Sequence, residues 1–196
     1  MSGPPPPSDL AGRVPEIVRL PVGTDVHRFY SSRFDPIHFD RSSDGRLNSP
    51  DGSYGVLYVA REPSGAFAET FLRRPGRTLI DTSFLSRKAY VRLRITSAMT
   101  VVRLAGPGLA IFGATAEVTH SGLPYDVSQA WSKALFAHPI GPAGIAYHAR
   151  HDDEALCYAL HERCAGGLAE VERIVDLDAD WFWRLAERYR IGLSPS

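Results

Sequence analysis

The chain has 196 residues, of which 44% are hydrophobic, so it is long and apolar enough for one domain with a sizeable core. Its 22 Lys and Arg residues balance 22 Asp and Glu residues, which argues against nucleic acid or an acidic membrane as its main partner. The two cysteines, Cys157 and Cys164, fit no common zinc or redox spacing, and no apolar run reaches the ~18 residues of a membrane helix. We therefore expect a cytoplasmic protein with reduced thiols.

The first segment, residues 1–20, opens with MSGPPPPSDLAG. Four consecutive prolines favour an extended backbone without internal hydrogen bonds. The segment lacks both the positive region and the apolar region of a secretory signal. We therefore predict a disordered, proline-rich lead-in over 1–20 and a single domain over 21–196.

The next part of the chain predicts two strands and a helix with one long loop between the strands. Residues 24–30 and the apolar run 54–60 read as strands, and residues 31–53, rich in Ser, Asp, Gly and Pro, read as a loop. Loops of that length inside a domain are usually functional. Residues 63–74 predict a helix with a proline in its first turn. Glu69 lies off the apolar face of this helix, which contains Ala66, Phe67, Thr70 and Phe71.

The second half predicts further strands and helices in an order that does not alternate strand with helix. The expected strands are 88–96, 99–104, 143–149 and 154–160, and the expected helices are 123–138 and 178–193. In the closing helix, Trp181, Leu185 and Tyr189 share one face. A mixed order of this kind favours an α+β domain over a doubly wound parallel sheet.

Five short motifs follow one another along residues 24–192, and together they resemble the RES-domain family. The motifs are HRFY, GRLN…YGVLYVA…AFAETF, YDVSQAW, GIAYHARHD…LCYAL and WFWRLAERYRI. Members of the family are toxins of bacterial toxin–antitoxin pairs whose antitoxin is of the Xre type. The resemblance implies an ADP-ribosyltransferase-like fold, in which a mixed split β-sheet with flanking helices forms a cleft for NAD.

The resemblance also implies an activity. It is the destruction of NAD⁺ by hydrolysis or phosphorolysis at the nicotinamide–ribose bond, with NAD⁺ as substrate and no separate cofactor or metal. Two alternatives stay open: transfer of ADP-ribose to a protein, and a catalytically silent module of the same fold that binds NAD or a partner. A secreted effector with the same chemistry is a weaker third. The expected partner is an Xre-type antitoxin that covers the cleft, with room for a homodimer inside the complex.

Carried over residue by residue, the resemblance assigns catalytic roles to Glu69, Arg28 and Tyr58. A carboxylate such as Glu69 stabilises the positive charge that develops on ribose during cleavage. The planar fork of arginine suits phosphate oxygens. A tyrosine offers a flat face to nicotinamide and a hydroxyl. Without the resemblance, Glu69 would read as a solvated partner of Arg73, and Tyr58 as a half-buried core residue.

Three further residues are expected to bind substrate, namely Arg46, Asn48 and Ser128. The family takes part of its name from a serine, and many relatives have it where this chain has Ala149. Ser128 is the nearest alternative source of a hydroxyl. The segment 148–153 also contains two histidines three apart, but in a strand and turn they would point to different faces, so we expect no metal site there.

Overall fold

The computed structural model describes residues 3–73, 76 and 78–194. Its strands are β1 (Ile17–Leu20), β2 (Asp25–Ser31), β3 (Val56–Ala60), β4 (Leu79–Ile80), β5 (Lys88–Ile95), β6 (Met99–Arg103), β7 (Gly144–Ala149), β8 (Asp152–His161), β9 (Leu168–Ile174) and β10 (Gly192–Leu193). Its α-helices are α1 (Pro63–Phe71), α2 (Thr82–Leu85), α3 (Pro107–Phe112), α4 (Glu117–His120), α5 (Asp126–Phe136) and α6 (Asp180–Arg188). Two 3₁₀ helices, η1 (Leu10–Gly12) and η2 (Glu162–Gly167), complete the list. No helix among the described residues has the length and apolar character to cross a bilayer.

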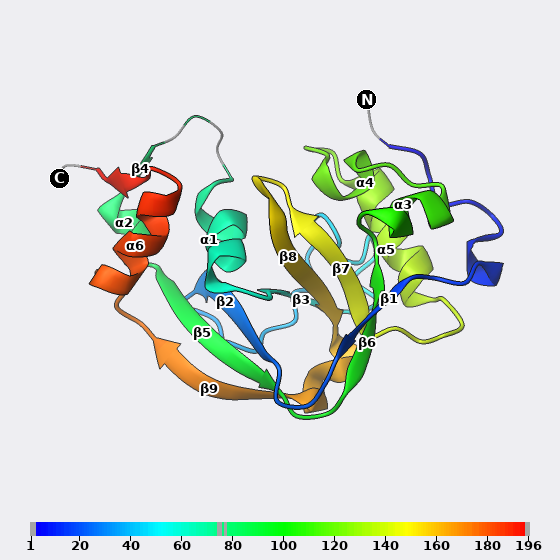
Figure 1. The fold of residues 1–196 in the computed structure, drawn as a ribbon, viewed down its shortest axis with the longest axis horizontal. Helices are drawn as coiled ribbons and strands as arrows, with labels where there is room; N and C mark the ends of the chain where they lie inside the picture. Colours follow the sequence, from blue (N-terminus) through cyan, green and yellow to red (C-terminus); the bar gives the residue numbers. More distant parts are fainter. Residues whose placement is uncertain (1–2, 74–75, 77, 195–196) are drawn as a thin grey trace.

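Eight strands form one strongly curved sheet in the order β1-β6-β7-β8-β3-β2-β5-β9. Neighbouring strands are antiparallel except β6 and β7, which are parallel. In Figure 1 the sheet has two arms, with β5, β2 and β9 on one side, β1, β6 and β7 on the other, and α1 between them. Helices α2 and α6 cover the first arm, and α3, α4 and α5 cover the second (Figure 1). The predicted α+β class and mixed sheet are confirmed.

The sheet splits between β2 and β3. These two strands pair only at His27 and Ala60, whereas β2 pairs with β5 from Asp25 to Ser31. Beyond the single β2–β3 pair, Asp40 from the long loop takes the place of β2 and bridges Val56 through two backbone hydrogen bonds of 2.9 Å. The arms can therefore separate without leaving Val56 unpaired, and a space opens between them.

Helix α1 lies close to the strands at this split because its residues at the contact have small side chains. Pro63 occupies the first turn, where its missing N–H costs nothing. A Cβ on Gly65 would stand 3.1 Å from the Cβ of Ala60 and 3.2 Å from that of Ala155, a tight contact that glycine avoids where the helix approaches the sheet. Ala66 and Phe67 are buried as predicted, and Glu69 is only partly buried. The predicted helix ran to residue 74, which lies outside the described residues, and the observed one ends at Phe71.

The N-terminal lead-in differs from the expectation of disorder over residues 1–20. Leu10 is buried, and Nε1–H of Trp131 donates a 2.7 Å hydrogen bond to the main-chain oxygen of Pro4. Residues 17–20 form β1 and pair with β6. A polyproline segment makes no internal hydrogen bonds, so its carbonyls are free to accept from a neighbouring side chain. Residues 1–2 lie outside the described part.

The C-terminal part holds two further differences from the sequence prediction. Helix α6 ends at Arg188 and not at 193, because Arg190 adopts a left-handed backbone (φ 54°) that turns the chain into β10. Its buried residues are Phe182 and Ala186, while Trp181 is only partly buried. Strand β9 was not predicted, since most of its side chains are exposed at the sheet edge and it lacks an apolar run.

Candidate active site

A cavity of about 480 Å³ opens where β2 and β3 separate. We call it the main cavity. Arg28, Tyr58 and Glu69 all line it, so the structure brings together the three residues expected to be catalytic. Arg28 comes from β2, Tyr58 from β3 and Glu69 from α1.

A smaller pocket of about 80 Å³ adjoins the main cavity, and we call it the side pocket. It shares Tyr58, Glu69 and Arg73 with the main cavity. Arg46 and Arg150 line the side pocket but not the main cavity. The glutamate therefore lies where the two spaces meet.

Both carboxylate oxygens of Glu69 accept hydrogen bonds. The hydroxyl of Tyr147, on β7, donates to Oε2 at 3.1 Å, and the main-chain N–H of Arg150 donates to Oε1 at 3.2 Å. Arg73 does not use the carboxylate, because its Nε–H donates to the main-chain oxygen of Glu69 at 2.8 Å. The side chain of Glu69 thus points toward the β7–β8 hairpin and does not form the surface ion pair with Arg73 that the i,i+4 spacing suggests.

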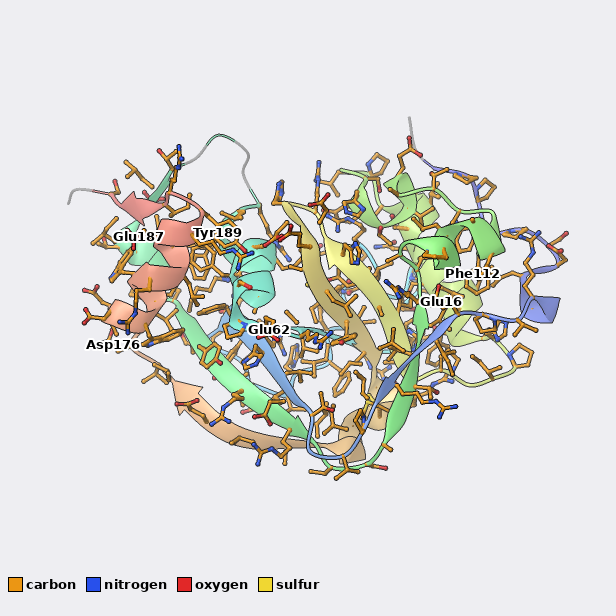
Figure 2. The ribbon with its side chains drawn as sticks, viewed as in Figure 1. Glu16, Glu62, Phe112, Asp176, Glu187 and Tyr189 are labelled. Carbon is orange, nitrogen blue, oxygen red and sulfur yellow. The ribbon has the colours of Figure 1, made fainter. Side chains whose placement is uncertain are left out.

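The turn that contains Arg150 is itself tied down. Tyr189, just after α6, donates its hydroxyl proton to Oδ2 of Asp152 at 2.5 Å, and its ring stacks on Phe67 of α1 at 5.5 Å between centroids. Figure 2 shows Tyr189 between α6 and α1. The hairpin, α1 and α6 are therefore linked at one point.

Tyr58 holds the long loop in place through its hydroxyl. That hydroxyl donates to Oδ1 of Asn48 at 2.9 Å and accepts the N–H of Leu47 at 2.8 Å. Burial raises the pKa of Tyr58 well above its ordinary value, so the phenol stays protonated. Tyr58 therefore lines both the main cavity and the side pocket from a fixed position.

Asn48, expected to bind substrate, lies behind Tyr58 and lines neither space. It is fully buried, and its Nδ2 donates to Oδ2 of Asp40 and to the oxygen of Ser42, each at 2.9 Å. Gly45 makes room for it, since a Cβ there would stand 2.2 Å from Oδ1 of Asn48. The GRLN motif is therefore a packed turn in which Asn48 organises the loop.

Arg28 also organises the loop while it lines the main cavity. Its Nη1 donates to the oxygens of Pro36 at 3.0 Å and His38 at 3.3 Å. Burial lowers its pKa to about 10, which leaves it charged at neutral pH. Arg28 thus presents a positive charge to the cavity from a fixed position.

Three more cations line the main cavity: Arg33, Arg73 and Lys88. Burial, and then the positive charge of Arg73, lower the pKa of Lys88. In the described part of the chain, neither Arg28 nor any of these three forms an ion pair with a carboxylate. The four cations outnumber the three carboxylates that line the same cavity, Asp40, Asp44 and Glu69, which favours an anionic ligand.

Arg46 enters the side pocket from the loop. Its Nη1 donates to the oxygen of Thr119 at 2.8 Å and its Nε to that of Ser121 at 3.1 Å. Its guanidinium lies 5.6 Å from the ring centre of Tyr125. In the described part of the chain no hydrogen bond of Nη2 is seen, which leaves this group for a ligand.

Ser128 is the predicted site residue that lies apart from the others. It is fully buried in α5, where its Oγ donates to the oxygen of Val118 at 2.6 Å and lies 3.1 Å from Oγ of Ser121. It lines neither space. The hydroxyl proton of Ser128 is therefore already used in a hydrogen bond within the protein.

Tyr147 was not among the candidate site residues predicted from the sequence, and neither were the cavity-lining cations Arg33, Arg73, Lys88 and Arg150. Tyr147 stands two residues before Ala149 in the motif GIAYHARHD, so a period of two would have placed both side chains on one face of a strand. Both are buried in the cluster that also includes Phe67 of α1.

The cysteines and the histidine-containing segment also bear on the sequence expectations, and Cys157 is among the residues that line the main cavity. Cys157 and Cys164 are free thiols, and burial raises the pKa of each. Residues 3–73, 76 and 78–194 contain no group of three or more His, Cys, Asp or Glu that could hold a metal ion.

Comparisons with known proteins give one family and one close fold. A family model described as the RES domain matches residues 19–182. No curated protein sequence is significantly similar to the chain. Among solved structures, a chain of the M. tuberculosis MbcT–MbcA toxin–antitoxin complex superposes with a TM-score of 0.66 at 14% identity, over 92% of this chain and 98% of that one. At this identity the likeness establishes a shared fold.

Proposed function

This chain belongs to the RES-domain family, and from that premise we propose that it is the toxin of a toxin–antitoxin pair that cleaves the nicotinamide–ribose bond of NAD⁺. The observation that supports it best is the position of Glu69. Its carboxylate is held by two donors at the junction of the main cavity and the side pocket. A fixed negative charge in such a place stabilises a cationic sugar transition state.

The chemistry needs little beyond that charge. The bond between nicotinamide nitrogen and C1′ of ribose breaks, and its electron pair leaves with nicotinamide, which becomes neutral. The oxygen of water or phosphate then bonds to C1′, and water gives up one proton. Glu69 faces the developing charge and can accept a hydrogen bond from a ribose hydroxyl or from the attacking water.

In this proposal, arginines supply the positive charge that complements the negative charge of the pyrophosphate. Arg28 lines the main cavity and Arg46 the side pocket, so in this proposal they hold the phosphates from two sides. Tyr58, a wall of both spaces, offers its ring to the nicotinamide. The volume of the main cavity lies within the range usual for small-molecule sites. NAD⁺ is then the substrate, with no cofactor.

The partner in this proposal is an Xre-type antitoxin that covers the main cavity in the cytoplasm, with a homodimer of the toxin allowed in the complex. The support is the fold shared with a chain of a toxin–antitoxin complex. A cell that makes an enzyme destroying NAD⁺ needs such a block.

A second candidate is a silent module that binds NAD⁺ or a partner without turnover. Ala149 favours it, because the side chain has no hydroxyl and Ser128 has its own already bonded. A third candidate, ADP-ribose transfer to a protein, shares the first step of cleavage and differs in the acceptor.

The test is incubation of the purified protein with NAD⁺, with and without phosphate, followed by chromatography of nicotinamide and the ADP-ribose product. We expect nicotinamide release that falls at least about 100-fold in Glu69→Gln, as for loss of a central electrostatic group. Glu62→Gln is the matched control, since Glu62 is exposed at the start of α1 (Figure 2). A phosphate requirement identifies phosphorolysis.

The other results separate the candidates. Calorimetric binding of NAD⁺ with no cleavage over hours would support the silent module. A mass increase on a cellular protein would support transfer. Equal rates in wild type and Glu69→Gln would contradict the proposed mechanism.

A further inference from the structure

The side chain of Tyr147 joins the sheet to helix α1 inside the site. Tyr147 is 1% exposed, yet it is among the residues that line the main cavity. Its hydroxyl reaches Oε2 of Glu69 at 3.1 Å. The two residues are 78 positions apart in the chain, so this bond depends on the packing of β7 against α1.

The hydroxyl acts as a donor in this bond. Burial, and then the nearby charge of Glu69, raise the pKa of Tyr147 well above its ordinary value. The phenol therefore keeps its proton at neutral pH. A carboxylate has no proton to give, so the phenol donates and the carboxylate accepts.

The second donor to Glu69 comes from the end of the same strand. The N–H of Arg150 follows Ala149, the last residue of β7, and it holds the other carboxylate oxygen. Strand β7 and the turn that follows it thus hold both oxygens. A free glutamate side chain samples several rotamers, and two donors at fixed positions restrict it to one orientation.

We propose that Tyr147 is a positioning residue for cleavage, whose hydroxyl orients the Glu69 carboxylate toward the bound ribose. This inference rests on the proposed function. The substrate does not need to touch Tyr147 for the effect. Loss of the hydroxyl should therefore lower kcat and leave KM for NAD⁺ nearly unchanged, because ground-state binding uses other groups.

The test compares Tyr147→Phe with Tyr54→Phe. Tyr54 is an equally buried tyrosine whose hydroxyl bonds Oγ of Ser132 at 2.8 Å, and it lines neither space of the site. Each variant loses one buried hydroxyl and one hydrogen bond. We expect kcat to fall about 10- to 100-fold in Tyr147→Phe, the range for a hydrogen bond to a charged group. In Tyr54→Phe we expect kcat within about twofold of wild type.

A second measurement follows the bond itself. Thermal midpoints are compared for Tyr147→Phe in the wild-type and Glu69→Ala backgrounds, with near-UV circular dichroism as a check of the fold. We expect Tyr147→Phe to lower the thermal midpoint less in the Glu69→Ala background than in wild type, because the hydrogen-bond partner is already absent there.

Each adverse result has its own meaning. Wild-type protein that leaves NAD⁺ intact overturns both the proposed function and this inference. Active wild type with unchanged kcat in Tyr147→Phe overturns the inference alone. A raised KM with unchanged kcat makes Tyr147 a substrate contact and overturns the positioning role. Equal losses of kcat in Tyr147→Phe and Tyr54→Phe, or equal midpoint losses in both backgrounds, also overturn it.

Discussion

The phenol of Tyr58 and the amide of Asn48 form a 2.9 Å hydrogen bond that joins strand β3 to the long loop of the site. Asn48 in turn holds Asp40 and Ser42, and Arg28 holds the loop at Pro36 and His38. A segment without regular structure is thereby fixed at several points. The loop can then form one wall of the main cavity.

Removal of that phenolic oxygen should destabilise the protein. Tyr58→Phe leaves the N–H of Leu47 and the buried Oδ1 of Asn48 without their partner, so we expect the free energy of unfolding to fall by about 1–3 kcal/mol. Urea denaturation measures it. Tyr158→Phe is the control, since in the described residues no hydrogen bond of the buried Tyr158 is seen. Equal stability of the two variants would contradict the role given to Tyr58.

A methyl group at Gly45 should displace Asn48 from the same network. The added Cβ would stand 2.2 Å from Oδ1 and 2.5 Å from Cγ of Asn48, so one of the two residues must move. We expect Gly45→Ala to cost about 1–3 kcal/mol of unfolding free energy, in the range of overpacked cores. Gly166→Ala, where an added Cβ meets nothing within 4 Å, should change it little. Thermal melts of both variants decide the point.

Loss of the Arg46 guanidinium should weaken NAD⁺ binding more than turnover. If Arg46 holds a phosphate from the side pocket, Arg46→Gln removes a charge-assisted bond and should raise KM about 10- to 100-fold. The exposed Arg41, paired with Glu162, is the control. Steady-state kinetics with NAD⁺ give both constants. An unchanged KM would place the pyrophosphate elsewhere.

Acid should weaken the protein through Asp25 on β2. Hydrogen bonds from Arg94 and then Arg92 hold the pKa of Asp25 at about 2, below the ordinary 3.8. This lowered folded-state pKa contributes stability above pH 3.8 that is lost as the pH falls through about 2. After allowance for solvent screening, the contribution is about 1 kcal/mol. Urea denaturation from pH 6 to pH 2 should show that the free energy of unfolding falls less in Asp25→Asn than in wild type. In the control variant Asp44→Asn, it should fall with pH as steeply as in wild type.

The sequence was sufficient for the central elements because each has a strong local pattern. The apolar run around Tyr58 and the helix around Glu69 are present at nearly the predicted bounds. Edge strand β9 has mostly exposed side chains, and short α2 has only four residues, so neither leaves a periodic signal.

Arg28, Tyr58 and Glu69 line the main cavity from elements with a strong local pattern, whereas Arg46 lines the side pocket from the irregular loop, where only the family resemblance suggested it. Asn48 and Ser128 line neither space, because their side chains are buried and hydrogen-bonded within the protein, which residue type and spacing alone do not reveal. The pairing of Tyr147 with Glu69 spans 78 positions and has no local signature.

The strand order has a consequence for protein synthesis. Strand β8 lies between β3 and β7, and its last residue, His161, pairs with Val56. We expect Tyr147, which pairs with Cys157 of β8, to take its place beside Glu69 only once β8 has left the ribosome. At about 5–20 residues per second, several seconds separate the completion of α1 from that moment. A nascent chain that ends before His161 therefore contains Glu69 but not the complete strand that joins β3 to β7.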